Sequence, residues 1–217
     1  MSHTDLAILL LLALVGLYRP VGAGSSYAAL LQPFDDGQRR RLAVGLFLGV
    51  AGVAVVTLLV VEPLLELLGL PAAALSATGG ITLMIAALPL MLGRAAEPDR
   101  QVSAPSGKSW RQVVVMPLTF PLTIGGAAIA VLIGFRAESH GPVGVLALIA
   151  AALLYAAVTG VCVLVAGRAG RGPADRARAV QDRVAGMLLT AIAATLLASG
   201  FTRLVASVLH GLGQHGH

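Results

Sequence analysis

GLYRPVGAGSS, residues 16–26, interrupts the first long apolar stretch of the chain with an arginine, a proline and three glycines. A helix that enters the bilayer at Leu6 reaches Arg19 about 20 Å into a hydrocarbon core about 30 Å thick. A charge at that depth costs from about 3 to more than about 10 kcal/mol without a partner, and Pro20 removes a helix hydrogen bond. The stretch therefore predicts a membrane helix that is broken near its middle, with an arginine at the break.

The composition is that of an integral membrane protein. Of the 217 residues, 57% are hydrophobic and 12% are charged, and the mean hydropathy is +0.89, far above the balance of a soluble domain. The net charge of +5 lies mostly in short loops, so we expect no nucleic-acid partner. The single cysteine, Cys162, excludes an intrachain disulfide and is expected to be a buried apolar side chain.

Six apolar stretches are long enough to cross a bilayer, which needs about 20 helical residues. They cover residues 6–31, 42–61, 70–93, 113–135, 143–167 and 184–209. The residues before the first stretch lack the basic region of a signal peptide, so we expect this segment to be retained. The segment EPLLELLGLP, residues 62–71, is expected to form an interfacial half-turn. The sequence predicts an all-α integral membrane protein with six transmembrane helices.

The distribution of lysine and arginine predicts the orientation. Twelve of these residues lie in the first, third and fifth connections, whereas only Arg136 and Arg203 belong to the other side. Because basic loops stay in the cytoplasm, both termini are predicted on the non-cytoplasmic side of a bacterial inner membrane. The polar residues 94–112 then form a cytoplasmic linker between a first three-helix repeat, 1–93, and a second repeat, 113–217, which ends in a short tail containing histidines.

The two halves resemble each other at corresponding positions. Aligning Pro20 with Pro121 sets RPVGAGSSYAALL beside FPLTIGGAAIAVL, and aligning Gly80 with Gly186 sets GITLMIAALPLMLG beside GMLLTAIAATLLASG. The two offsets, 101 and 106 residues, are nearly equal. Since each half has an odd number of spans, the copies have opposite orientations and form an inverted repeat with helices one and four broken.

Broken helices at corresponding positions of two halves indicate a transporter binding site near the membrane midplane. Freed backbone N–H groups at half-helix ends attract anions, and the guanidinium of Arg19 could bind a carboxylate or phosphate through two hydrogen bonds. The alternative is structural: Arg19 caps carbonyls freed by Pro20, and the hydroxyls bond back to the helix backbone. The candidate substrate-binding residues are Arg19, Pro20, Gly22, Gly24, Ser25, Ser26, Pro117, Thr119, Pro121, Thr123, Gly125 and Gly126.

Other residue classes argue against catalysis. No nucleophile with its base, no phosphate loop and no metalloprotease motif is present, so we expect neither an enzyme nor a cofactor. Every carboxylate is predicted near a membrane surface, with Glu62, Glu66 and Glu138 on the non-cytoplasmic side, which gives no support to a buried proton relay. Coupling to an ion would use carbonyls and hydroxyls, or Glu62 or Glu66 folded inward. The histidine tail, residues 210–217, is expected to be disordered rather than a metal site.

Small residues in the third and sixth spans have two interpretations. Close packing of helices is the preferred role of Gly79, Gly80 and Gly186, because small side chains let helix backbones approach in lipid. The same faces could instead join the protomers of a homo-oligomer.

These motifs resemble the MarC-related family of six-span bacterial membrane proteins, which includes neutral amino-acid transporters and is related to the LysE group of exporters. RPVG (19–22) stands where the family typically has Asn-Pro-Ile-Gly, and PLTFPLTIGGAAI (117–129) is similar to its Pro-Leu-x-x-Pro-Leu-x-x-Gly-Pro-Gly-x-Ile signature. The third and sixth spans are similar as well. Arg19 in place of the Asn, AGSSY after Gly22 and Gly126 in place of a Pro depart from the family at the predicted site.

The resemblance implies a secondary transporter or exporter of a small solute, such as a neutral amino acid or a related small carboxylate, bound between helices one and four. The extra guanidinium of Arg19 suits two alternatives equally, another small anion or a lipid headgroup. A non-transporting membrane assembly subunit is a third alternative, in which the small-residue faces bind partners.

Overall fold

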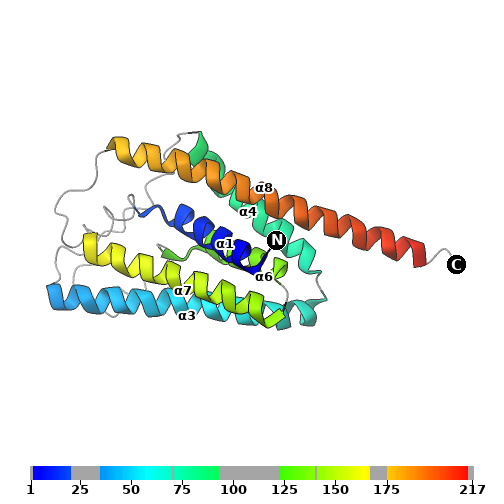
Figure 1. Ribbon diagram of the computed structural model, residues 1–217, viewed down its shortest axis with the longest axis horizontal. Helices are drawn as coiled ribbons and strands as arrows, with labels where there is room; N and C mark the ends of the chain where they lie inside the picture. The colour runs from blue at the N-terminus through cyan, green and yellow to red at the C-terminus, as the bar shows by residue number, and fades with distance from the viewer. Residues whose placement is uncertain are drawn as a thin grey trace.

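The computed structural model describes residues 2–20, 35–69, 71–92, 123–139, 141–166 and 175–214. Within these ranges the chain forms six α-helices (Figure 1). They are α1 (His3–Tyr18), α3 (Asp36–Leu68), α4 (Ala72–Met91), α6 (Gly126–Glu138), α7 (Gly141–Ala166) and α8 (Asp175–Gln214).

The membrane character expected from the composition is confirmed. Four helices are long and apolar enough to cross a bilayer: α3, α4, α7 and residues Ala179–Ser207 of α8. Their outward faces expose large apolar side chains, as contact with lipid requires. These side chains include Val56, Leu59, Val143, Leu146, Val161 and Met187.

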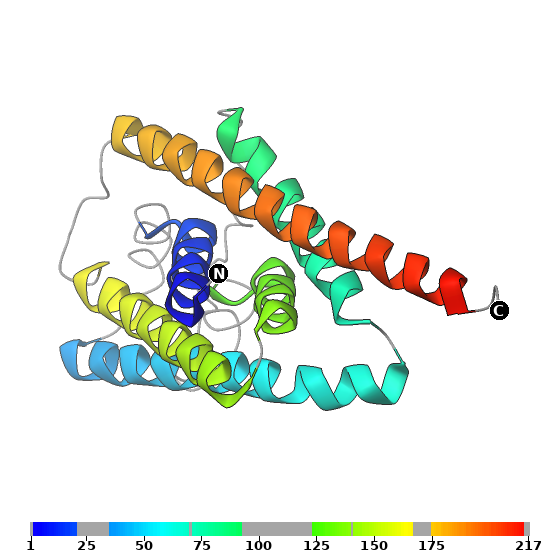
Figure 2. The ribbon, with the colours of Figure 1, turned by 45° about the vertical axis from the view of Figure 1, so that its right-hand side comes forward.

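α1 and α6 are shorter than a membrane span. With 16 and 13 residues they are about 24 and 20 Å long, against a hydrocarbon core of about 30 Å. Both lie between a layer formed by α3 and α7 and a layer formed by α4 and α8 (Figures 1 and 2). α1 is covered only in part, because Ile8 and Leu12 are exposed on one of its faces.

α1 and α6 run in opposite directions along each other. Leu6 and Leu9 of α1 line the same small cavity as Phe135 near the end of α6. At the same end, His3 and Ser139 both lie against Gly144 of α7. We call this end of the bundle, where α1 begins and α6 ends, the Glu138 end.

Glycines bring α4 very close to its neighbours. A Cβ added at Gly79 would lie 2.9 Å from the Cα of Gly134 on α6, and one added at Gly80 would lie 2.8 Å from Leu197 on α8. At Gly186 the added Cβ would meet the backbone of Met91, again at the contact of α4 with α8. The predicted role of these glycines in close helix packing is confirmed.

Two boundaries differ from the sequence prediction. Residues 62–68 continue α3 past Pro63 and end at Gly69, whose φ of 64° is left-handed, so the expected half-turn is helix. α8 extends to Gln214 and projects beyond the other helices (Figures 1 and 2), so the tail expected to be disordered is helical over residues 210–214. In both places a helix already nucleated continues into a less apolar sequence, which costs less than starting a new one.

The beginning of α1 is fixed by a capping box. The backbone N–H of Asp5 donates to Ser2 Oγ at 3.1 Å, and the backbone N–H of Ser2 donates to Asp5 Oδ2 at 2.9 Å. Hydrogen bonding of the Asp5 carboxylate to the Ser2 side chain and to the Ser2 backbone N–H lowers the pKa of the Asp5 carboxyl. The carboxylate also lies favourably at the positive end of the helix dipole.

Candidate functional site

α1 ends at Tyr18, inside the bundle. Arg19 is the C-cap, with φ 50° and ψ 71°, and its backbone N–H donates to the carbonyl of Val15 at 3.1 Å. This left-handed conformation usually belongs to glycine, and a side chain there costs roughly 1–2 kcal/mol. Arg19 is half-buried, and Pro20 follows it directly. The structure thus ends the described helix at the predicted break.

α6 begins abruptly at the second break. Its N-cap, Gly125, has an extended backbone and makes no side-chain capping bond, since it has no side chain. Among the described residues, nothing lies within 4 Å of a Cβ added at Gly126, the first helical residue, and Gly126 is exposed. The start of α6 carries the positive end of the helix dipole.

Tyr155 of α7 connects the two breaks. Its hydroxyl donates to the backbone carbonyl of Thr123 at 2.8 Å, and its ring lies edge-on to that of Tyr18, with centroids 6.0 Å apart. All three residues are buried. The last residue of α1 and a residue three positions before α6 therefore contact the same side chain.

Five of the twelve predicted site residues belong to the described chain: Arg19, Pro20, Thr123, Gly125 and Gly126. The other seven, Gly22, Gly24, Ser25, Ser26, Pro117, Thr119 and Pro121, lie outside the described residues. Tyr155 was missed by the sequence reasoning. Its signal was an isolated tyrosine in an apolar span, where a buried hydroxyl needs a hydrogen-bond partner.

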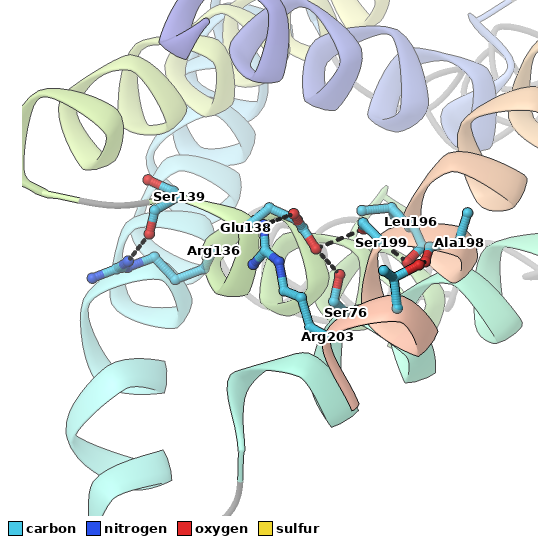
Figure 3. Close-up of polar contacts among 9 residues, drawn as sticks. Ser76, Arg136, Glu138, Ser139, Leu196, Ala198, Ser199 and Arg203 are labelled. Atoms are coloured by element: carbon cyan, nitrogen blue, oxygen red, sulfur yellow. Dashed lines mark hydrogen bonds and ion pairs between the residues drawn. The ribbon is translucent and has the colours of Figure 1, made fainter. Parts of the chain in front are cut away.

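A second polar group lies at the Glu138 end (Figure 3). Glu138 Oε1 accepts hydrogen bonds from the hydroxyls of Ser76 on α4 and Ser199 on α8, the latter at 2.7 Å. Its Oε2 forms an ion pair with Arg203 on α8 at 2.7 Å. The Glu138 side chain is 8% exposed, whereas that of Arg203 is 42% exposed. We call these four residues the Glu138 cluster.

Arg136, two residues earlier, points to the opposite side of α6 (Figure 3). Its guanidinium donates to the carbonyls of Leu58 on α3 and Ser139, each at 3.2 Å, and forms an ion pair with Glu62 on α3. The Arg136 side chain is 9% exposed and that of Glu62 is 60% exposed. The last turn of α6 is thus bound on two faces.

Glu138 and Arg136 are predicted on the non-cytoplasmic side, and this stays a prediction; the structure adds that both side chains are buried between helices at the end of α6. Burial is tolerated because each charge meets an opposite charge and hydrogen-bonding groups from other helices. A signal was available: Arg203 lies inside the last apolar stretch, and an intramembrane arginine needs a carboxylate partner.

Two cavities lie beside α1, and only the smaller one contacts the Glu138 cluster. A groove of about 760 Å³ runs between α1 and α8, and its α1 side is formed by Leu12, Val15 and Gly16. Its α8 side is apolar except for Gln181. A much smaller cavity, about 20 Å³, lies beside Glu138 and Ser199.

A model of the MarC family of integral membrane proteins matches residues 4–205, which include both breaks and the Glu138 cluster. The chain belongs to this family. The resemblance seen in the sequence motifs is confirmed. Comparisons of this MarC family member with curated proteins and with solved structures give no match. Among the described residues, no group of three or more His, Cys, Asp or Glu side chains could hold a metal ion.

Proposed function

We propose that this MarC family protein is an inner-membrane secondary transporter or exporter of a neutral amino acid or a related small carboxylate. The substrate binds near the midplane, where α1 ends and α6 begins. The observation that carries the proposal is the meeting, at one buried side chain, Tyr155, of two chain breaks that belong to helices shorter than a membrane span.

The chemistry of the two breaks suits a carboxylate. The N-cap of α6 makes no side-chain hydrogen bond, and among the described residues nothing lies within 4 Å of a Cβ added at Gly126, so the first N–H groups of α6 can donate to an anion. Arg19 ends α1 with a guanidinium, which binds carboxylates through two parallel hydrogen bonds. A strained, left-handed arginine is itself a feature found more often at functional sites.

Alternating access requires two units that move against each other, and the contact of α4 with α8 supports inverted repeats. Gly80 and Gly186, which align at an offset of 106 residues, make reciprocal contacts: Gly80 with Leu197 and Gly186 with Met91. Met91 and Leu197 are also 106 residues apart. A two-fold axis in the membrane plane would produce this exchange.

One observation favours a second candidate, an amphipathic anion such as a lipid headgroup with its acyl chain. The apolar groove between α1 and α8 is large, and its lining residues Val15 and Gly16 precede Arg19 by about one helical turn. An acyl chain in this groove would leave its headgroup near the guanidinium.

The test has two stages. Purified protein is first screened for stabilisation by amino acids, organic anions and lipids, because a bound ligand raises the apparent stability. The flux of each hit is then measured in proteoliposomes, with chemical analysis of the transported solute. An unmodified solute on the far side supports transport without catalysis, whereas a covalently changed one supports an enzyme.

Arg19→Ala should raise the KM for an anionic substrate roughly 10- to 100-fold, the cost of a lost charge-assisted hydrogen bond. Arg19→Asn should restore little of the lost affinity. Arg40→Ala, on the exposed start of α3, serves as the matched control. Unchanged affinity in Arg19→Ala would show that Arg19 does not bind the substrate. Neither binding nor flux of any solute would favour a non-transporting assembly subunit.

A further inference from the structure

The carboxylate of Glu138, on α6, binds side chains of both α4 and α8 (Figure 3). Oε1 binds hydroxyls from two different helices, and Oε2 binds Arg203. Any outward movement of α6 from α4 or α8 must break at least one of these bonds. A buried carboxylate that loses a partner is left incompletely satisfied, so the cluster resists such movement.

Arg136 binds the same turn of α6 to the other layer of the bundle. Residues two apart on a helix lie on nearly opposite faces, so Arg136 reaches α3 while Glu138 reaches α4 and α8. The short helix α6 is therefore attached at its end to both layers. Its start, at Gly126, has no comparable side-chain attachment among the described residues.

The space enclosed at this end is too small for a solute. The cavity beside Glu138 measures about 20 Å³ and is bounded by Leu6 of α1, Phe135 and Leu196. That volume holds about one water molecule. As far as the described residues show, the Glu138 end is closed.

From these contacts we infer that Glu138 keeps this end of the transporter closed, at the side predicted to be non-cytoplasmic. The helix ends that separate on opening are called the gate, and Glu138 is called its latch. The inference rests on the proposed alternating access. Release begins at Arg203, because its guanidinium is the most exposed member of the cluster and water can replace its contact. Ser76 and Ser199 then separate from Glu138 as α6 leaves α4 and α8.

The experiment measures accessibility rather than flux. Cys162→Ser removes the single cysteine, and Leu196→Cys places a thiol at a buried position that lines the cavity beside Glu138. A membrane-impermeant maleimide is added to vesicles of each orientation. Glu138→Gln should increase the labelling rate about tenfold from the non-cytoplasmic side only, because the open population grows with the lost interaction.

Two variants make the comparison quantitative. Arg203→Gln keeps both hydroxyl bonds to Glu138 and should give a smaller increase than Glu138→Gln. Glu66→Gln, an exposed carboxylate on the last turns of α3, is the matched control and should change nothing. If Glu138→Gln does not fold, as judged by gel filtration and thermal unfolding, Arg203→Gln alone carries the test.

Labelling that stays within about twofold of the parent in both folded variants would overturn the latch, because a released gate must admit water. An equal increase with Glu66→Gln would also overturn it. If labelling increases as expected but no solute is transported, the latch stands and the transporter proposal fails. The two ideas can therefore fail separately.

Discussion

The two ends of α6 are held by different chemistry. At its start, Gly125 and Gly126 have no side chains that could bind a neighbouring helix, and the Tyr155 hydroxyl donates to the carbonyl of Thr123 just before the helix. At its end, Arg136 and Glu138 bind side chains and carbonyls from three other helices. The two ends therefore have different roles in the proposed function: the first backbone N–H groups of α6 bind a ligand, whereas the last turn of α6 binds side chains of the protein itself.

Substitution of Tyr155, which contacts both breaks, should have the largest effect on the free energy of unfolding. Tyr155→Ala should lower the free energy of unfolding by about 4 kcal/mol, because it removes a fully buried aromatic side chain. Tyr155→Phe keeps the ring beside Tyr18 and should cost only about 1 kcal/mol, the net value of one hydrogen bond. Denaturant titration in detergent, followed by circular dichroism, measures both. Equal losses would mean that the hydroxyl, not the ring, joins α1 to α6.

At the other end of α6, Arg136→Met should destabilise the protein by about 3 kcal/mol. The methionine retains the apolar stem but leaves the carbonyls of Leu58 and Ser139 without their donor. Glu62→Gln should cost less, about 1 kcal/mol, since this carboxylate is 60% exposed and water can replace the lost charge contact. The same unfolding measurement applies. A larger loss for Glu62→Gln than for Arg136→Met would contradict the assigned contacts.

The sequence was sufficient to predict the start of α6, because its features are local. Prolines and glycines inside an apolar stretch predict a break wherever the chain runs, and the described chain ends α1 at Tyr18 and begins α6 at Gly126. Close packing of Gly79, Gly80 and Gly186 followed from the same kind of argument.

The end of α6 could not be predicted in the same way, because its contacts join residues far apart in the sequence. Glu138 and Arg203 are 65 residues apart, and Arg136 and Glu62 are 74 apart. Only the packing of α6 against α3, α4 and α8 shows that these charges meet, so each alone suggested a loop near the membrane surface. Residues 21–34 and 93–122, with seven predicted site residues, lie outside the described chain and stay predictions.

Arg203, the most exposed member of the Glu138 cluster, should contribute less to the free energy of unfolding than Arg136 does. Arg203→Gln should lower stability by about 1 kcal/mol, since the guanidinium is 42% exposed while Ser76 and Ser199 continue to bind Glu138. The loss should shrink at about 1 M salt, where the Debye length falls to about 3 Å and the parent's own ion pair is screened. Thermal unfolding at low and high salt measures this. A loss independent of salt would indicate packing of the arginine stem instead.

Substitution of Gly126 is expected to have the smallest effect on the free energy of unfolding and, at the same time, a clear effect on ligand affinity. Gly126→Ala places a methyl group at the first position of a helix, with no described residue within 4 Å, so the free energy of unfolding should change by no more than about 0.5 kcal/mol. The same methyl group narrows the approach of a carboxylate to the first N–H groups of α6, and affinity for an anionic substrate should fall about 3- to 10-fold. Gly37→Ala, in the first turn of α3 and likewise without a described neighbour within 4 Å, is the matched control and should alter neither quantity. Ligand-dependent thermal shifts and proteoliposome flux supply the two measurements. Because the substitution is expected to leave the fold unchanged, a loss of affinity would show that the ligand binds at this helix start. Unchanged affinity would show that the ligand binds elsewhere, and it would not bear on the ion pairs at the other end of α6.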